Sequence, residues 1–80
     1  MQMLLVVRNR ILQLCNKHDL TINKLATISA LSPSSVKSIL YGKSNDPKLS
    51  TIKKICDGLE ITLGEFFDTP EFNNLEQEIK

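Results

Sequence analysis

The sequence predicts an all-α fold, a compact bundle of five short helices followed by a short C-terminal helix. Apolar residues recur at the three- and four-residue spacing of helices along most of the chain. The three Gly and three Pro residues lie near the ends of these segments, and Ser or Thr residues precede several of them, as helix caps do. With 80 residues and 41% hydrophobic content, the chain is large enough for one small domain. We assign residues 1–68 to this domain and residues 69–80 to an acidic tail helix.

The first helix is predicted to run from Leu4 to about residue 18. Its core-facing residues follow an i, i+4, i+7, i+8, i+11 pattern and lie on or near one face: Val7, Ile11, Leu14, Cys15 and His18. Cys15 and Cys56 are far apart and lack the C-x-x-C spacing of zinc and redox sites. Since each cysteine falls on an apolar helix face, we predict two buried free thiols and no metal site.

Residues 21–42 are predicted to form two helices joined by a tight turn. Thr21 caps the second helix, which ends near Ser29, and the third begins at Pro33 after the N-cap residue Ser32 and stops at Gly42. Apolar residues supply the seam between these helices: Leu25, Ala26, Leu31, Val36, Ile39 and Leu40. The polar residues of the third helix then point away from the seam. A helix-turn-helix places such a second helix in the major groove of DNA.

The remaining helices are predicted from apolar spacing and capping residues. The fourth covers residues 50–59, and its apolar face closes the core: Ile52, Ile55, Cys56 and Leu59. Thr62-x-x-Glu65 is a capping box that opens a short fifth helix. Thr69-Pro70 begins a tail helix of about ten residues, marginal by itself, whose apolar stripe is Phe72, Leu75 and Ile79. We expect this tail to fold back on its own domain, to dimerise with a second copy, or to remain loose.

The two parts of the chain carry opposite charge, although the whole chain has a net charge of only +1. Residues 1–54 hold nine Lys and Arg against two Asp, a net +7, and residues 55–80 hold one Lys against seven acidic residues, a net −6. This segregation suits a polyanion-binding part joined to a solubilising or partner-facing part, the plainer alternative being solvated surfaces. The apolar run at residues 3–7 is too short for a signal peptide or a membrane span, so we expect a cytoplasmic protein without membrane contact.

A single series of apolar, turn and capping residues extends over most of the chain. It comprises Leu25-Ala26, Leu31-Ser32, Val36, Ile39, Tyr41-Gly42-Lys43, Pro47-x-Leu49, Ile52, Ile55, Leu59 and Ile61-Thr62-x-x-Glu65-Phe66. Over residues 8–67 the chain resembles the phage-repressor/Cro-like helix-turn-helix proteins, the xenobiotic-response-element class, which implies a lambda-repressor-like fold. It departs from them at Ala30, where the family usually has Gly. A Cβ makes positive φ cost about 1 kcal/mol, so we expect slight strain or an altered turn there. Pro33 lacks an N–H, so any DNA contact there would be apolar.

The resemblance implies binding to double-stranded DNA through the third helix. The positions that match base-contacting residues are Ser34, Lys37 and Ser38, with Ser35 and Tyr41 beside them. The candidate phosphate contacts are Arg10, Asn23, Lys24, Thr27, Lys43, Ser44 and Asn45. Because the third helix presents no Arg, Asn or Gln for bidentate base readout, we expect modest direct specificity, supplemented by DNA shape or dimer spacing. The family commonly binds DNA as a two-fold dimer, which implies a homodimer here.

These observations predict a sequence-specific transcriptional regulator, a phage or mobile-element repressor. The alternative is an antitoxin-type interaction module whose acidic tail, residues 71–80, covers a basic protein partner. Catalysis is not expected, because the sequence shows no Ser/His/Asp or Cys/His arrangement, no phosphate-cradling Gly loop and no metal cluster. We therefore expect no cofactor, and we assign His18, the single histidine, to the end of the first helix.

Overall fold

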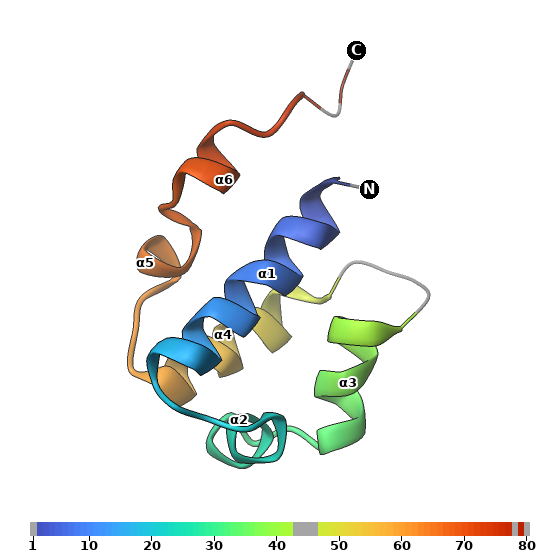
Figure 1. The fold of residues 1–80 in the computed structure, drawn as a ribbon, viewed down its shortest axis with the longest axis vertical. Coiled ribbons are helices and arrows are strands. Elements are labelled where there is room, and N and C mark those ends of the chain that lie inside the picture. The colour runs from blue at the N-terminus through green and yellow to red at the C-terminus, as the bar shows by residue number, and fades with distance from the viewer. Residues whose placement is uncertain (1, 43–46, 78, 80) are drawn as a thin grey trace.

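The computed structural model describes residues 2–42, 47–77 and 79, and all the regular secondary structure in these parts of the chain is helical (Figure 1). The helices are α1 (Gln2–Lys17), α2 (Ile22–Ile28), α3 (Pro33–Tyr41), α4 (Leu49–Leu59), α5 (Leu63–Phe67) and α6 (Pro70–Asn73). The predicted all-α bundle is therefore confirmed. The expectation that His18 lies on the apolar face is wrong, because His18 follows the last residue of α1 and is exposed.

The core is formed by one face from each of the first five helices, with α1 between α3 on one side and α5 on the other (Figure 1). Its buried apolar residues are Val7, Ile11, Leu14, Cys15, Leu25, Ala26, Val36, Leu40, Ile52, Ile55, Cys56, Leu59 and Phe66. Both cysteines are buried and free, as predicted. None of the helices in the described residues combines the length and the apolar character needed to span a bilayer.

The connections after α1, α2 and α4 share one three-residue pattern: a residue with positive φ, an apolar residue, and a Ser or Thr that caps the next helix. They are Asp19-Leu20-Thr21, Ala30-Leu31-Ser32 and Glu60-Ile61-Thr62, with φ of 55°, 55° and 60° at the first residue of each. In each connection the apolar residue donates its backbone N–H to the carbonyl five residues earlier, at 2.8–3.0 Å. This is the Schellman arrangement, which satisfies carbonyls left unpaired at a helix end. Ala30 therefore adopts the positive φ of a turn that usually has Gly, and the strain expected there stays a prediction.

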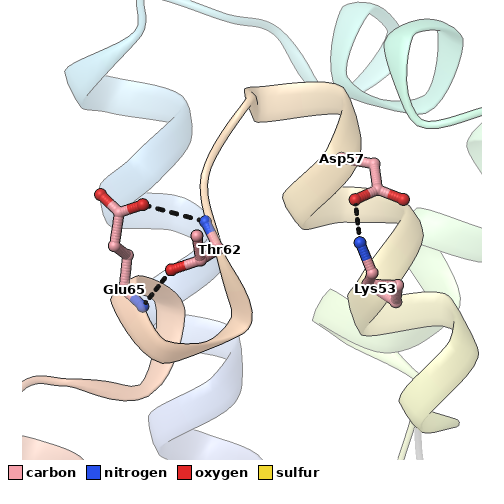
Figure 2. A network of polar contacts seen from close by, with 4 residues as sticks. All are labelled: Lys53, Asp57, Thr62 and Glu65. Atoms are coloured by element: carbon pink, nitrogen blue, oxygen red, sulfur yellow. Dashed lines mark hydrogen bonds and ion pairs between the residues drawn. The ribbon is translucent and has the colours of Figure 1, made fainter.

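Side chains at the helix starts explain where the next helices begin. The Thr21 hydroxyl accepts from the Lys24 N–H at 3.1 Å. Figure 2 shows the predicted capping box, in which the Thr62 hydroxyl accepts from the Glu65 N–H and the Glu65 carboxylate accepts from the Thr62 N–H, each at 3.0 Å. The other pair in Figure 2 is the exposed i, i+4 ion pair between Lys53 and Asp57 on α4.

The C-terminal tail differs from its prediction. Its helix, α6, contains only four residues and ends before Leu75, so the three apolar tail residues do not share one helical stripe. Phe72 is half-buried and packs on the core, with its ring centroid 4.9 Å from that of Phe67 and 6.1 Å from that of Phe66. Ile79, by contrast, is 88% exposed. The prediction of a ten-residue helix is wrong. A helix this short needs packing along its length, and in the described residues the tail packs on the core only at the turn that contains Phe72.

Candidate nucleic-acid interface

Helix α3 has one buried face and one exposed face. Val36 and Leu40 are buried in the core and Ile39 is half-buried, which turns one side of the helix inward. The opposite side carries an exposed row at i, i+3, i+4 and i+7, with Ser35 exposed beside it: Ser34, Lys37, Ser38 and Tyr41. All five residues predicted to contact bases are therefore exposed on α3, and their contact with DNA stays a prediction.

The serines at the start of α3 form a small hydrogen-bonded cluster. The Ser32 hydroxyl accepts from the Ser35 N–H at 3.1 Å and so caps the helix, as predicted. The same hydroxyl lies 3.1 Å from the Ser34 hydroxyl and 2.9 Å from the Ser35 hydroxyl. A hydroxyl has one proton to donate and two lone pairs. Ser34 and Ser35 therefore have partners within the chain but keep capacity for a further hydrogen bond.

Apart from Arg10, the predicted phosphate contacts divide into two groups. Asn23, Lys24 and Thr27 are exposed on α2, although the Thr27 hydroxyl donates to the Asn23 carbonyl at 3.0 Å. Leu25 and Ala26, on the inner side of α2, are buried and bring it against α3. Three further predicted contacts lie outside the described residues: Lys43, Ser44 and Asn45.

Arg10 has a different place from the one expected for a phosphate contact. Its Nε donates to the Phe66 carbonyl at 2.8 Å and its Nη2 to the Glu65 carbonyl at 2.8 Å, while Nη1 donates to the Gln13 side chain at 2.7 Å. Arg10 thus caps carbonyls of α5, whereas the predicted contact surface is formed by α2 and α3. We leave Arg10 out of the interface, because its guanidinium is held by the fold.

Arg8 of α1 contacts the third helix, α3, and the sequence does not indicate this contact. This half-buried residue of α1 donates from Nε to the Ile39 carbonyl at 2.7 Å and from Nη2 to the Gly42 carbonyl at 2.6 Å. Both acceptors belong to the end of α3 or to its C-cap residue. Because every residue has a carbonyl, the acceptors of such a contact leave no signal in the sequence.

Comparisons with known proteins agree with this arrangement. Residues 10–71 match the model of the Cro/C1-type HTH DNA-binding domain. The HTH-type transcriptional repressor RghR of Bacillus subtilis (strain 168) is 42% identical over 45 residues, 56% of this chain and 33% of the relative, so the chain spans about a third of the length of that curated relative. The crystal structure of the prophage Lp1 protein 11 is similar with a TM-score of 0.76 and 36% identity, over 86% of this chain and 91% of that chain. The chain belongs to the Cro/C1-type helix-turn-helix DNA-binding domains.

Proposed function

We propose that the chain is a transcriptional repressor that recognises a specific double-stranded DNA sequence by inserting α3 into the major groove. The observation that carries the proposal is the exposed row of α3, which lies opposite the buried Val36 and Leu40 in a Cro/C1-type domain. The similarity to a protein named as a repressor supports repression. The similarity to a prophage protein supports a phage or mobile-element setting.

The base contacts in this proposal come from Ser34, Lys37 and Ser38, with Ser35 and Tyr41 beside them. Lys37 is suited to the O6 and N7 acceptors of guanine, and serine hydroxyls can donate or accept. Sequence preference from such a set is modest, because α3 contains no Arg, Asn or Gln, the side chains that supply most bidentate pairs with bases. DNA shape and the spacing of two half-sites supply the rest of the specificity.

The affinity in this proposal comes mainly from phosphate contacts. Asn23, Lys24 and Thr27 on α2 lie in the segment that carries the basic excess, a net +7 over residues 1–54. Lys43, Ser44 and Asn45, which follow α3 in the sequence, complete the proposed set. Neutralising phosphates releases counterions, so operator affinity is expected to fall steeply as salt rises.

We also propose that the chain binds its operator as a homodimer. One domain of this size presents one helix to one half-site, and a two-fold dimer doubles that contact. Ile79, a large apolar side chain that is 88% exposed near the end of the tail, is available for such an interface. The operator is then expected to be an inverted repeat with half-sites about one helical turn apart.

Selection from a random duplex library with the purified chain tests the proposal. We expect an inverted repeat to be enriched. We expect Ser38→Ala to cost about 0.5–1.5 kcal/mol and Lys37→Ala about 1.5–3 kcal/mol in operator binding, and both variants to relax selectivity. Lys53→Ala is the matched control, because Lys53 lies on α4 and is paired with Asp57. Unchanged affinity and selectivity in both α3 variants would show that α3 is not the recognition helix. Absence of enrichment even at low salt would exclude sequence-specific binding.

A further inference from the structure

Arg8 and Arg10 are two residues apart on α1 and reach opposite sides of the molecule. Residues at this spacing are separated by about 200° around a helix, so their side chains leave in nearly opposite directions. Arg10 donates to two carbonyls of α5, and Arg8 donates to the carbonyls of Ile39 and Gly42 at the end of α3. Figure 1 shows α1 between these two helices. The two arginines therefore hold two different helices to the same central helix.

The contact made by Arg8 is a strong one for its type. The last carbonyls of a helix have no partner within it and form the negative end of the helix dipole. A guanidinium that donates twice to such carbonyls makes two charge-assisted hydrogen bonds in one planar fork. The distance of 2.7 Å to Ile39 is at the short end of the usual range, and the distance of 2.6 Å to Gly42 is just below it. Arg8 is half-buried, which reduces competition from water.

The end of α3 is also constrained by its own backbone. The Gly42 N–H donates to the Ser38 carbonyl at 2.9 Å, and a Cβ on Gly42 would lie 2.2 Å from that same oxygen. The chain therefore passes very close to α3 as it leaves the helix, and Arg8 binds the Gly42 carbonyl as well. Tyr41 is 65% exposed, so its side chain provides little further anchoring.

We propose that Arg8 is a positioning residue for DNA recognition, which sets the angle of α3 against α1 without touching DNA itself. The buried Val36 and Leu40 hold α3 on the core, but apolar contacts permit small rotations that two directed hydrogen bonds prevent. A rotation of α3 would move Lys37 and Ser38 relative to the base edges. This proposal rests on the proposed function, since it concerns the same helix.

The test compares Arg8→Lys with Arg10→Lys in the full chain, well below the unfolding temperature. Each variant keeps its positive charge but replaces a fork of donors by a single ammonium group. Arg10→Lys is the matched control, because it removes the same type of cap from α5 instead of α3. We expect Arg8→Lys to lower affinity for the selected operator about tenfold, with little change for a scrambled duplex and in the salt dependence. Arg10→Lys is expected to leave the ratio of the two affinities unchanged.

Two results would overturn the proposal. The first is an operator preference in Arg8→Lys equal to that of the wild type. The second is an equal loss of preference in Arg8→Lys and Arg10→Lys, which would indicate a merely structural effect. A phosphate contact would instead show as full affinity in Arg8→Lys together with a salt slope reduced by about 1 in Arg8→Gln. Amide exchange without DNA separates this proposal from the function itself. Faster exchange of residues 39–42 in Arg8→Lys alone would establish that Arg8 holds α3, even if the wild-type chain selects no duplex and the proposed function fails.

Discussion

Three residues, Asp19, Ala30 and Glu60, adopt a backbone conformation that favours glycine, and each of them ends a helix by closing a Schellman motif. The left-handed region brings Cβ close to the following carbonyl, which costs roughly 1–2 kcal/mol. None of the three is glycine, so the fold carries this cost three times. The cost is offset by the hydrogen bonds of each turn and by the apolar residue that follows it.

Ala30→Gly is expected to stabilise the protein by up to about 1 kcal/mol, because removing the Cβ relieves more strain than the added freedom of the unfolded chain costs. Chemical denaturation measures the change. The control is the same pair of residues at an exposed helical position, Lys54→Gly compared with Lys54→Ala, where glycine is expected to cost about 1 kcal/mol. A loss of stability in Ala30→Gly as large as that of the control would refute the strain.

The two buried thiols predict a dependence of stability on alkaline pH. Burial raises the pKa of Cys15, and burial followed by the charge of Asp57 raises the pKa of Cys56. The folded state therefore keeps these protons at a pH where the unfolded chain releases them, so stability is fully present below about pH 8.5 and falls as pH rises above it. We expect the free energy of unfolding to fall less between about pH 8 and pH 10 in a Cys15→Ala, Cys56→Ala double variant. Equal slopes would contradict this assignment.

At the scale of the elements, α2 and α4 approach each other closely at Gly58. A Cβ on Gly58 would lie 2.6 Å from the Ile28 carbonyl oxygen and 2.8 Å from the Ser29 hydroxyl, so the two helices pack at a distance that only glycine permits. The Ser29 hydroxyl is itself buried and has no hydrogen-bond partner among the described residues. This contact positions α2, which is the first helix of the helix-turn-helix, against α4.

Gly58→Ala is expected to destabilise the protein by about 1–3 kcal/mol, although alanine is the better helix former, because backbone atoms of α2 must move. Gly64→Ala is the matched control. Gly64 is exposed on α5, and its added Cβ would meet only the Thr62 hydroxyl at 3.7 Å, so this variant is expected to gain up to about 1 kcal/mol. Thermal or chemical unfolding compares the stability of the two variants. A gain in stability from Gly58→Ala would show that a Cβ fits between α2 and α4.

At the scale of the whole molecule, the tail packs on the core through Phe72, the large apolar side chain that reaches it among the described tail residues. Phe72 packs on Phe67 in an edge-to-face arrangement, next to the buried Phe66. The tail therefore docks on the domain through this ring, which is one of the alternatives expected for it, and the boundary after residue 68 stays a prediction. The segregation of charge along the chain places seven of the nine acidic residues in residues 55–80, three of them in the tail.

Phe72→Ala is expected to lower the free energy of unfolding by roughly 1–3 kcal/mol, since it removes a half-buried ring from an aromatic cluster. Ile79→Ala is expected to change it by less than about 0.5 kcal/mol, because Ile79 is 88% exposed. Denaturation at low protein concentration, where any dimer dissociates, isolates the folding of one chain. Equal effects of the two substitutions would mean that the tail does not dock through Phe72.

The sequence by itself determined the local features of this protein. Caps at Thr21, Ser32 and Thr62, and the helical spacing of apolar residues, place the first five helices within a few residues of their observed bounds and identify the exposed face of α3. These features are readable because a cap or an amphipathic helix depends on side chains close together in the chain. The helix-turn-helix assignment, which the family match confirms, rests on the same local pattern.

Only the tertiary structure decided what depends on distant backbone. Arg8 and Arg10 are both basic residues on one helix, and nothing in the sequence distinguishes a phosphate contact from a cap on α3 or α5, because their acceptors are main-chain carbonyls. The length of α6 was decided by whether tail side chains found a surface to pack on, as Phe72 does and Ile79 does not. A short helix gains too little from its own hydrogen bonds to persist without such packing.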